Sequence, residues 1–479
     1  MIKVPEINLS TTVISFLLFF LVSGCEKDSD KTAPSISVEI ITQSELCSVG
    51  DTIKFNIIIS DNNLVKSLTI VPEIPGKNKE SQVEEEINEQ TVEFEYSYVL
   101  SDRQNPDSIL RIQFNAIDND GNESTENIEL DVKPVIVHTE VTTDETWHAG
   151  IHIIQNKIYL DSVSLTIEPG VEIRFDKDTW LGVNNGSSLM ATGDKENNIV
   201  FTANTASPYA GFWGGIQFNS NASSNPSINA NLEYCIVEYC GSNEYPPTSS
   251  AVYIQGGDVS IKNCVISDVN GYGLSTFTLS GDIDSNTFKT CTRHIVRIPF
   301  EMLPTLGSGN KFLPSEPWYG IELIGDVFND VTLENLNVPY FLPSSTSVYA
   351  KLSIKPGVVF KFGGISDYYS EFIVYGSINA SGTENEKITF MLNEESIKKF
   401  WSGIVISNPS APCTLNYCDI SHGGGLLGNI RLDETSDQVT ISNCTISNSV
   451  GYGIYFDSSS NPILENNTFY DNDNGDFYQ

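Results

Sequence analysis

Basic side chains that could hold a substrate gather in only one short segment of this 479-residue chain. Arg293, His294 and Arg297 lie there, and two guanidinium groups at that spacing could hold an anionic sugar polymer. The same segment also suits an exposed turn of the chain. Carboxylate pairs occur throughout a sequence with 62 acidic residues, and none is joined in sequence to a base. We therefore predict no catalytic residue, while an enzymatic role stays open.

Aromatic side chains in predicted loops form a second group of candidates, because sugar rings stack on exposed aromatic faces. Five tyrosines lie in such loops and have no counterpart in the internal repeat described below. Ligand contacts concentrate in loops, although each ring could instead fill a turn. The candidate contacts with a glycan are therefore Arg293 and Arg297 together with Tyr209, Tyr245, Tyr340, Tyr368 and Tyr369.

An acidic turn offers oxygen ligands for a metal ion. Asp118, Asp120 and Asn122 alternate along the chain, which is a spacing typical of Ca²⁺ ligands. The same residues, with Gly121 between them, also suit a hairpin turn in which Asp, Asn and Gly supply positive φ angles. Bound Ca²⁺ is thus one of two hypotheses for this turn, and the sequence indicates no other cofactor.

Cys25 follows an apolar run over residues 13–22 that is too short to cross a bilayer, which needs about 20 residues. The sequence Val22-Ser23-Gly24-Cys25 resembles the lipobox of bacterial lipoproteins. This resemblance implies a signal peptide over residues 1–24, lipidation of Cys25 and a membrane partner through the lipid anchor. Residues 25–33 form an acidic tether that resembles the export signal of surface-displayed Bacteroidetes lipoproteins. The expected location is the outer membrane, facing outward.

The overall charge excludes one class of partner. With 26 basic and 62 acidic residues, the formal net charge is −36. Such a chain cannot displace the counterions of a polyphosphate, so we expect no nucleic-acid partner. Charged residues make up only 18% of the sequence and hydrophobic residues 40%, which favours a packed protein over a disordered chain.

The elements that position these candidates begin with a β-rich segment over residues 34–134. Short runs of alternating apolar and polar residues are separated by turn residues about every ten positions, which predicts a β-sandwich. The runs 110–116 and 127–132 resemble the closing hairpin of immunoglobulin-like modules in bacterial surface proteins. We therefore expect a small immunoglobulin-like domain.

The rest of the chain contains a tandem duplication, with modules over about 147–310 and 318–479. Leu165–Phe175 recurs as Leu352–Phe362, and Trp213 recurs as Trp401 within matching Phe-Trp-x-Gly-Ile segments. A residue kept at one place in both copies most simply serves the fold, so we expect both tryptophans to pack in the core.

A shorter period lies inside each module. Cys235, Cys264 and Asn286 are spaced 29 and 22 residues apart, and each precedes an apolar position by two residues. Returning short strands predict the coils of a solenoid, with like side chains stacked in ladders. We therefore expect these cysteines to be free thiols. The pattern resembles right-handed parallel β-helix proteins of the pectin-lyase-like class over residues 140–479, so the expected fold class is all-β.

These inferences favour a surface-anchored lipoprotein whose β-helix binds glycans or mediates adhesion without catalysis. An extracellular polysaccharide is the expected partner. Two alternatives stay open, because a fold does not supply a function. One is a polysaccharide lyase or glycoside hydrolase of the β-helix type, and the other is a structural protein of the cell envelope.

Overall fold

The computed structural model describes residues 30–41, 52–73, 83–100, 108–132, 135–220, 227–241, 249–313, 320–363, 370–393, 400–425 and 427–478. The chain divides into two compact units, Met1–Ile136 and Val137–Gln479. Within the described ranges, no helix is long and apolar enough to cross a membrane. The predicted signal peptide, Cys25 and Cys47 lie outside the described residues.

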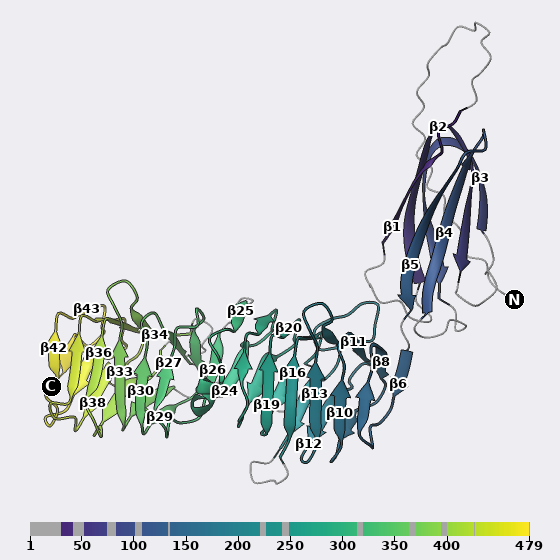
Figure 1. Ribbon diagram of the computed structural model, residues 1–479. Coiled ribbons are helices and arrows are strands. Elements are labelled where there is room, and N and C mark those ends of the chain that lie inside the picture. The colour runs from purple at the N-terminus through teal and green to yellow at the C-terminus, as the bar shows by residue number, and fades with distance from the viewer. Residues whose placement is uncertain are drawn as a thin grey trace, which may run out of the picture. The chain divides into compact units, whose positions relative to one another are not determined.

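The first unit is a five-stranded antiparallel sheet (Figure 1). Its strands are paired in the order β1-β2-β4-β5, with β3 also paired to β2. They are β1 (Ser35–Ile40), β2 (Thr52–Glu73), β3 (Val83–Val99), β4 (Ser108–Asp118) and β5 (Glu123–Val132). The pairing of β2 with β3 shifts register between Ser60 and Ser67, and such bulges let long strands bend.

The core of the first unit packs strand against strand across this bent sheet. Phe55 of β2, Tyr96 of β3 and Phe114 of β4 are buried. The Phe55 and Phe114 rings lie 5.6 Å apart, and the Tyr96 and Phe114 rings lie 6.4 Å apart. The core of this unit is thus formed within one hydrogen-bonded sheet. The sheet is bent, so that apolar side chains from its two parts pack against each other.

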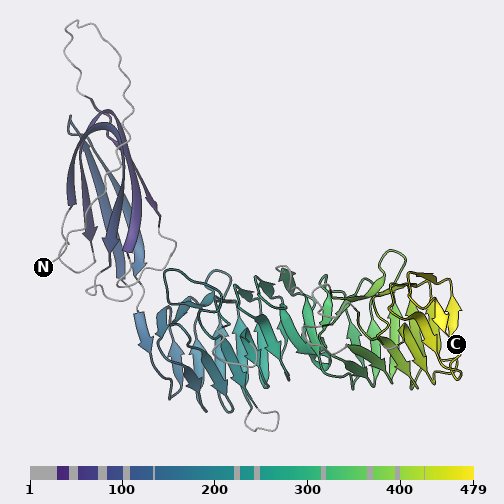
Figure 2. The same ribbon diagram turned by 180° about the vertical axis from the view of Figure 1, so that it is seen from behind.

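The second unit is a solenoid of short parallel strands stacked coil on coil (Figure 1, Figure 2). Its first copy contributes a six-stranded and an eight-stranded sheet. The six-stranded sheet contains β7 (Glu145–Trp147), β10 (Ser164–Ile167), β13 (Ser188–Thr192), β16 (Asn229–Glu233), β19 (Asp258–Lys262) and β22 (Ile283–Asp284). The eight-stranded sheet contains β6 (Val135–His138), β8 (Gly150–Ile154), β11 (Val171–Phe175), β14 (Ile199–Ala203), β17 (Cys235–Glu238), β20 (Val265–Ser267), β23 (Thr287–Lys289) and β25 (Lys311–Leu313).

A 13-stranded sheet, called the long sheet below, runs through both copies. Its strands are β9 (Ile158–Leu160), β12 (Leu181–Asn184), β15 (Ile216–Asn219), β18 (Ser250–Ile254), β21 (Tyr272–Thr276), β24 (Val296–Pro299), β26 (Ile321–Ile324), β28 (Tyr340–Leu342), β31 (Val359–Phe362), β34 (Ile388–Leu392), β37 (Cys418–Ser421), β40 (Thr445–Ser447) and β43 (Thr468–Tyr470). A short 3₁₀ helix, η1 (Phe300–Thr305), follows β24.

The second copy adds two six-stranded sheets. One contains β27 (Val331–Leu333), β30 (Lys351–Ile354), β33 (Ser377–Ser381), β36 (Cys413–Asn416), β39 (Val439–Ser442) and β42 (Ile463–Glu465). The other contains β29 (Thr346–Val348), β32 (Glu371–Val374), β35 (Gly403–Ser407), β38 (Gly428–Asp433), β41 (Tyr452–Phe456) and β44 (Phe477–Tyr478).

Corresponding strands of the two copies do not belong to the same sheet of the solenoid. Strand β11 of the first copy belongs to the eight-stranded sheet, whereas its sequence counterpart β31 belongs to the long sheet. A strand of the second copy therefore does not lie on the same sheet as its counterpart in the first copy. It lies on the next sheet that the chain reaches along each coil. The change occurs at β24, β26 and β28, which we call the module junction.

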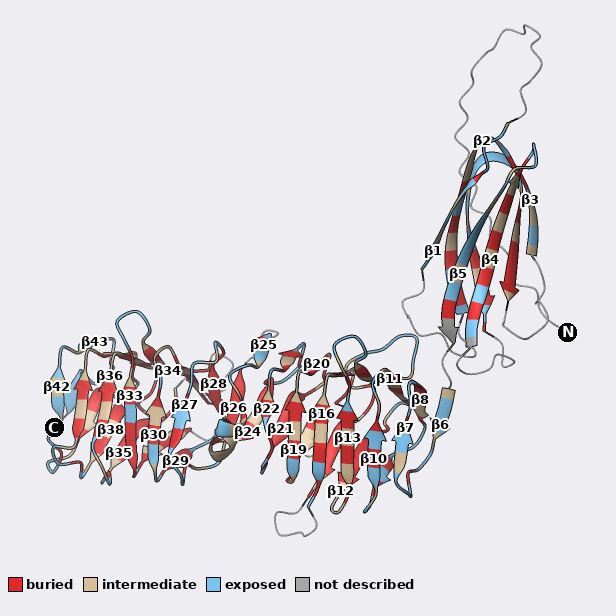
Figure 3. Cartoon of the chain, viewed as in Figure 1, coloured by how far each residue is buried: buried red, intermediate tan, exposed pale blue. Residues whose placement is uncertain are grey.

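Alternating side chains fill the solenoid interior, which Figure 3 shows as red bands along the strands. Trp213 and Trp401 are fully buried, as predicted from their repetition. Each stacks on a phenylalanine at 3.9 Å, Trp213 on Phe175 and Trp401 on Phe362. The repeated tryptophans are therefore core residues and not sugar platforms.

The predicted ladder of cysteine and asparagine is present at one corner of the coils. The backbone N–H of Cys235 donates to Cys264 Sγ at 3.3 Å, and that of Cys264 donates to Asn286 Oδ1 at 2.9 Å. The second copy repeats this pattern, since the N–H of Cys418 donates to Cys444 Sγ at 3.4 Å. All seven cysteines within the described residues are free and buried.

Candidate functional site

A cluster of charged and hydroxyl groups lies at the module junction. The Arg297 Nε of β24 donates to Glu322 Oε1 of β26 at 2.9 Å, and the Tyr272 hydroxyl of β21 donates to Glu322 Oε2 at 2.8 Å. Arg297 and Glu322 are register partners, and their strand neighbours Val296 and Leu323 are core residues. Because side chains alternate along a strand, the ion pair lies on the outer face of the long sheet.

The surroundings fix the protonation states in this cluster. Burial and the Glu322 charge raise the pKa of Tyr272 to about 12, so its hydroxyl keeps its proton at neutral pH. The Arg293 guanidinium lies 5.6 Å from the Tyr272 ring centre, and that of Arg297 lies 5.2 Å from the Phe277 ring centre. The cluster thus contains two guanidinium groups and one carboxylate, with Arg297 paired to Glu322 and Arg293 lying against the Tyr272 ring.

His294 completes the segment but turns away from water. It is buried and its ring stacks on Phe341 of β28 at 4.3 Å. Burial, Lys361 and Arg293 together lower the pKa of His294 to about 4. The imidazole is therefore neutral at physiological pH and adds no charge to the cluster.

A row of polar side chains extends from the cluster along the same outer face. Gln217, Tyr253, Ser275 and Arg297 are register neighbours on four adjacent strands. Among the described residues, Gln217 Oε1, Ser275 Oγ and Arg297 Nη1 are buried atoms without a hydrogen-bond partner. Unsatisfied buried polar groups cost free energy, so these three atoms point to an interaction that the described residues do not supply.

The structure separates the predicted contact residues. Arg293 is exposed and joins the cluster with Arg297, whereas Tyr209 is 49% exposed and packs edge-on against Phe212. The prediction for Tyr340 is wrong, because this residue lies in β28, is 1% exposed and donates its hydroxyl to the Glu334 carbonyl. The prolines that flank Tyr340 in the sequence favour a loop, which is why the sequence alone suggests an exposed ring there. Three further candidates, Tyr245, Tyr368 and Tyr369, lie outside the described residues.

Sequence reasoning missed Gln217, Tyr272, Ser275 and Glu322. Gln217 lies on β15, Tyr272 and Ser275 lie on β21, and Glu322 lies on β26, so only the strand register brings the three strands together. No spacing within the sequence marks them as neighbours, because the intervening loops differ in length.

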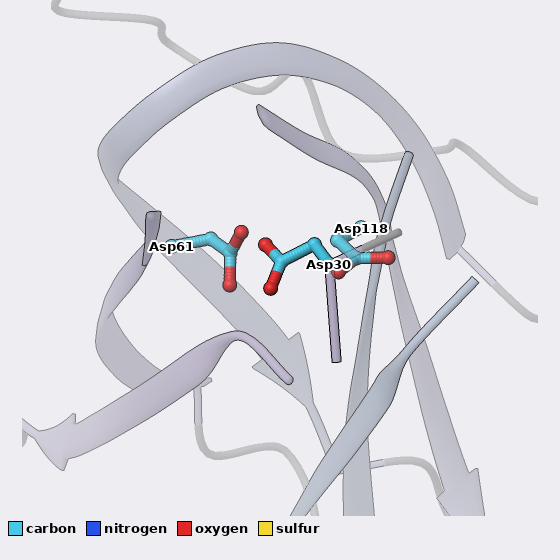
Figure 4. A group of neighbouring side chains, drawn as sticks. All are labelled: Asp30, Asp61 and Asp118. Atoms are coloured by element: carbon cyan, nitrogen blue, oxygen red, sulfur yellow. The ribbon is translucent and has the colours of Figure 1, made fainter. Parts of the chain in front are cut away.

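A second candidate site lies in the first unit, where three carboxylates converge (Figure 4). Asp30, Asp61 and Asp118 place one oxygen each within 4.8 Å of the others. The Asp30 Oδ1 and Asp61 Oδ1 atoms accept hydrogen bonds from nearby backbone N–H groups, while their Oδ2 atoms are buried without a partner. Hard carboxylate oxygens in this arrangement fit a Ca²⁺ ion.

The predicted metal ligands are only partly brought together. Asn122 directs its side-chain amide at Asp118 Oδ2 at 2.7 Å, and Asp120 Oδ2 accepts from the side chain of Asn63 at 2.6 Å. Asp118 Oδ1 accepts from the backbone of Asp120 and Asn122, which is a hairpin-turn pattern. Asp118 also lies close to Asp30 and Asp61, two carboxylates that the spacing within the turn did not indicate.

The turn also holds Asp118 in its charged form. Burial by itself would raise the pKa of this carboxyl group. Hydrogen bonds from Asn122, Gly121 and Asp120 outweigh that effect and lower the pKa. Asp118 thus remains an anion over the whole neutral range, as a cation ligand must.

The comparisons with known proteins support the class that this architecture defines. Residues 138–255 match the model of a pectate-lyase-like β-helix domain, and residues 360–478 match that of a right-handed β-helix region. The chain is therefore a right-handed parallel β-helix protein. A search of curated proteins found no match.

Solved structures give only distant similarities. A catalytically inactive OgpA from Akkermansia muciniphila, in complex with an O-glycopeptide, shows 14% identity over 21% of this chain and 29% of its own, with a TM-score of 0.17. Spo0M of Bacillus subtilis shows 6% identity over 22% and 50% of the two chains, also with a TM-score of 0.17. Pectate lyase PelI from Erwinia chrysanthemi, in complex with tetragalacturonic acid, shows 9% identity over 80% and 88%, with a TM-score of 0.12. This chain thus spans less than a third of the first protein and half of the second.

Proposed function

We propose that this protein is a surface-exposed lipoprotein of the outer membrane whose β-helix binds a glycan without cleaving it. The cluster at the module junction is the observation that supports binding. It joins Arg293, Arg297 and Glu322 to Gln217 and Ser275, whose side-chain oxygens Oε1 and Oγ have no hydrogen-bond partner among the described residues. Charged hydrogen-bonding groups beside aromatic rings are typical of sites for sugar polymers.

The protonation states of the cluster disfavour turnover. Tyr272 has a pKa of about 12 and keeps its proton near pH 7, so it is a poor base for abstracting a proton from a sugar. Glu322 accepts hydrogen bonds from both Arg297 and Tyr272, so both oxygens of its carboxylate are already engaged within the cluster.

A polysaccharide lyase or glycoside hydrolase is the second candidate function. The observation that favours it is the ion pair of Glu322 and Arg297 on one sheet face, with a second guanidinium group, that of Arg293, against the Tyr272 ring. A structural role in the cell envelope is the third candidate. It would leave unexplained why Gln217 Oε1 and Ser275 Oγ are buried without a hydrogen-bond partner among the described residues.

We also propose that the carboxylates of Asp30, Asp61 and Asp118 bind Ca²⁺ in the first unit. Three like charges within 4.8 Å repel each other unless a cation neutralises them. The two unpartnered Oδ2 atoms of Asp30 and Asp61 are the oxygens that such an ion would satisfy. The expected effect is on the stability of this unit and not on catalysis.

A single assay separates the three functions. The purified full chain is passed over immobilised neutral and anionic polysaccharides, and the eluate is examined for new reducing ends and for the ultraviolet absorbance of unsaturated uronides. Retention without products is the result we expect. Sustained product release would establish the enzyme instead, and passage through every column would leave the structural role.

A further inference from the structure

A stack of three exposed aromatic rings lies on consecutive coils just after the module junction. Phe328, Tyr349 and Tyr375 are 63%, 48% and 40% exposed. The rings of Phe328 and Tyr349 lie 5.2 Å apart and 4° from parallel, and those of Tyr349 and Tyr375 lie 5.4 Å apart and 13° from parallel. We call these three residues the aromatic stack.

The fold does not require aromatic residues at this corner. Tyr349 and Tyr375 directly follow β29 and β32, whose counterparts in the first copy are β9 and β12. The residues that directly follow β9 and β12 are Asp161 and Asn185. The same corner is therefore built with polar side chains in one copy, so the aromatic stack is a departure specific to the second copy.

One face of the stack is open to a ligand. Tyr349 covers one face of Phe328, yet 63% of Phe328 stays exposed, which leaves its opposite face accessible. Polar groups lie beside that ring. Glu301 Oε1 of η1 accepts from the Phe328 backbone N–H at 3.3 Å and from the Asn329 side chain at 2.8 Å. A carboxylate and an amide are thus held against the backbone of Phe328 and at the next residue, and a sugar ring offers both an apolar C–H face and hydroxyl groups.

The alternative occupant, a second copy of this chain, fits less well. Three rings form a patch far smaller than the roughly 800 Å² that each partner buries in a stable protein interface. Two chains that each carry a formal charge of −36 also repel each other. A single sugar ring needs neither a large area nor a complementary charge.

We propose that the aromatic stack is a subsite for a neutral sugar, which packs its C–H face on the open face of Phe328 while Glu301 and Asn329 contact its hydroxyl groups. The Glu301 carboxylate repels an acidic sugar, so the subsite selects neutral residues of the glycan. This subsite rests on the proposed glycan-binding function and refines it.

The test compares single variants of the purified full chain in titrations with soluble xylan, mannan, dextran and polygalacturonate. Phe328→Ala should weaken binding of a neutral polysaccharide roughly tenfold, because it removes most of the apolar contact. Phe328→Trp should retain or improve binding. Phe477→Ala is the matched control, since Phe477 is 57% exposed on the last strand of the solenoid and should leave binding unchanged.

Each outcome bears on one level of the proposal. Wild-type binding that Phe328→Ala leaves intact would refute the subsite while keeping the glycan-binding function. An equal loss in Phe477→Ala, or a Phe328→Ala variant that loses as much affinity for polygalacturonate as for the neutral polymers, would also refute the subsite. No binding of any polymer by the wild-type chain would overturn the proposed function itself.

Discussion

At the scale of single residues, the first coil of the solenoid contains a histidine pair that can charge only at a cost to the fold. His138 Nε2 and His152 Nδ1 are hydrogen-bonded at 2.8 Å, and both rings stack on Trp147. Burial and the charge of His152 lower the pKa of His138 to about 4, although Glu145 opposes this. The pKa of His152 is lowered by burial as well. Both imidazoles are therefore neutral in the folded state near pH 7.

This pair predicts a pH-dependent stability. In the unfolded chain these histidines have a pKa near 6.5, so they bind protons at a pH where the folded histidines stay neutral. The free energy of unfolding therefore falls as the pH drops from about 6.5 toward 4. Thermal unfolding from pH 7.5 to 5 should show this loss, and His138→Phe should reduce its slope. His422→Gln is the control, because His422 is exposed. Equal slopes in the wild type and His138→Phe would contradict the prediction.

The buried cysteines give a second prediction at this scale. Cys235, Cys240 and Cys418 have pKa values raised by their surroundings, mainly burial for the first two and hydrogen bonding to Cys444 for the third. A thiol that is buried and protonated does not react. A thiol reagent should therefore leave these three cysteines, among the seven in the described residues, unmodified in the folded chain and label them after unfolding in denaturant. Peptide mapping under non-reducing conditions that found a disulfide among the seven would refute this.

At the scale of elements, the converging carboxylates of Asp30, Asp61 and Asp118 predict that Ca²⁺ stabilises the first unit. Ca²⁺ at millimolar concentration should raise the melting temperature of the first unit, because the ion neutralises three converging carboxylates. Asp61→Asn should abolish the shift. Asp120→Asn should preserve it, since Asp120 lies outside the group. A shift that survives Asp61→Asn, or the same shift with Mg²⁺, would contradict a specific Ca²⁺ site.

The elements also show what the sequence can and cannot predict. Coil ladders such as Cys235 with Cys264 were predictable, because each coil repeats a short pattern at nearly constant length. The alignment of Gln217 and Ser275 on either side of Tyr253 was not, because it depends on the register of strands separated by loops of unequal length. Asp30 and Asp61 could not be predicted as neighbours of Asp118 either, because they come from distant parts of the chain.

At the scale of the whole molecule, the duplication explains why the candidate site is single. What both copies retain is the core, as the matching stacks of Trp213 on Phe175 and Trp401 on Phe362 show. Arg297 and Glu322 lie on β24 and β26, where the second copy begins one face further around the solenoid. The module junction occurs once, so its side chains need not follow the pattern that both copies share.

The anchor is a further prediction at this scale. A palmitate analogue supplied to cells should label the protein, because the sequence before Cys25 resembles a lipobox. Cys25→Ala should remove both the label and the association with the membrane fraction. The control is Cys47→Ala, which should change neither. Lipid retained by Cys25→Ala would disprove the lipoprotein assignment.

The central claim is that the outer face at the module junction binds a glycan, and Arg293 tests it most directly. Its guanidinium is exposed and contacts the Tyr272 ring, so Arg293→Ala removes a ligand contact without emptying the core. Titration of the retained polysaccharide should show affinity lowered roughly tenfold in Arg293→Ala, as expected for lost charged hydrogen bonds. Arg111→Ala, which removes an exposed arginine of the first unit, should bind like the wild type. Equal affinities for all three proteins would contradict a binding site at the junction.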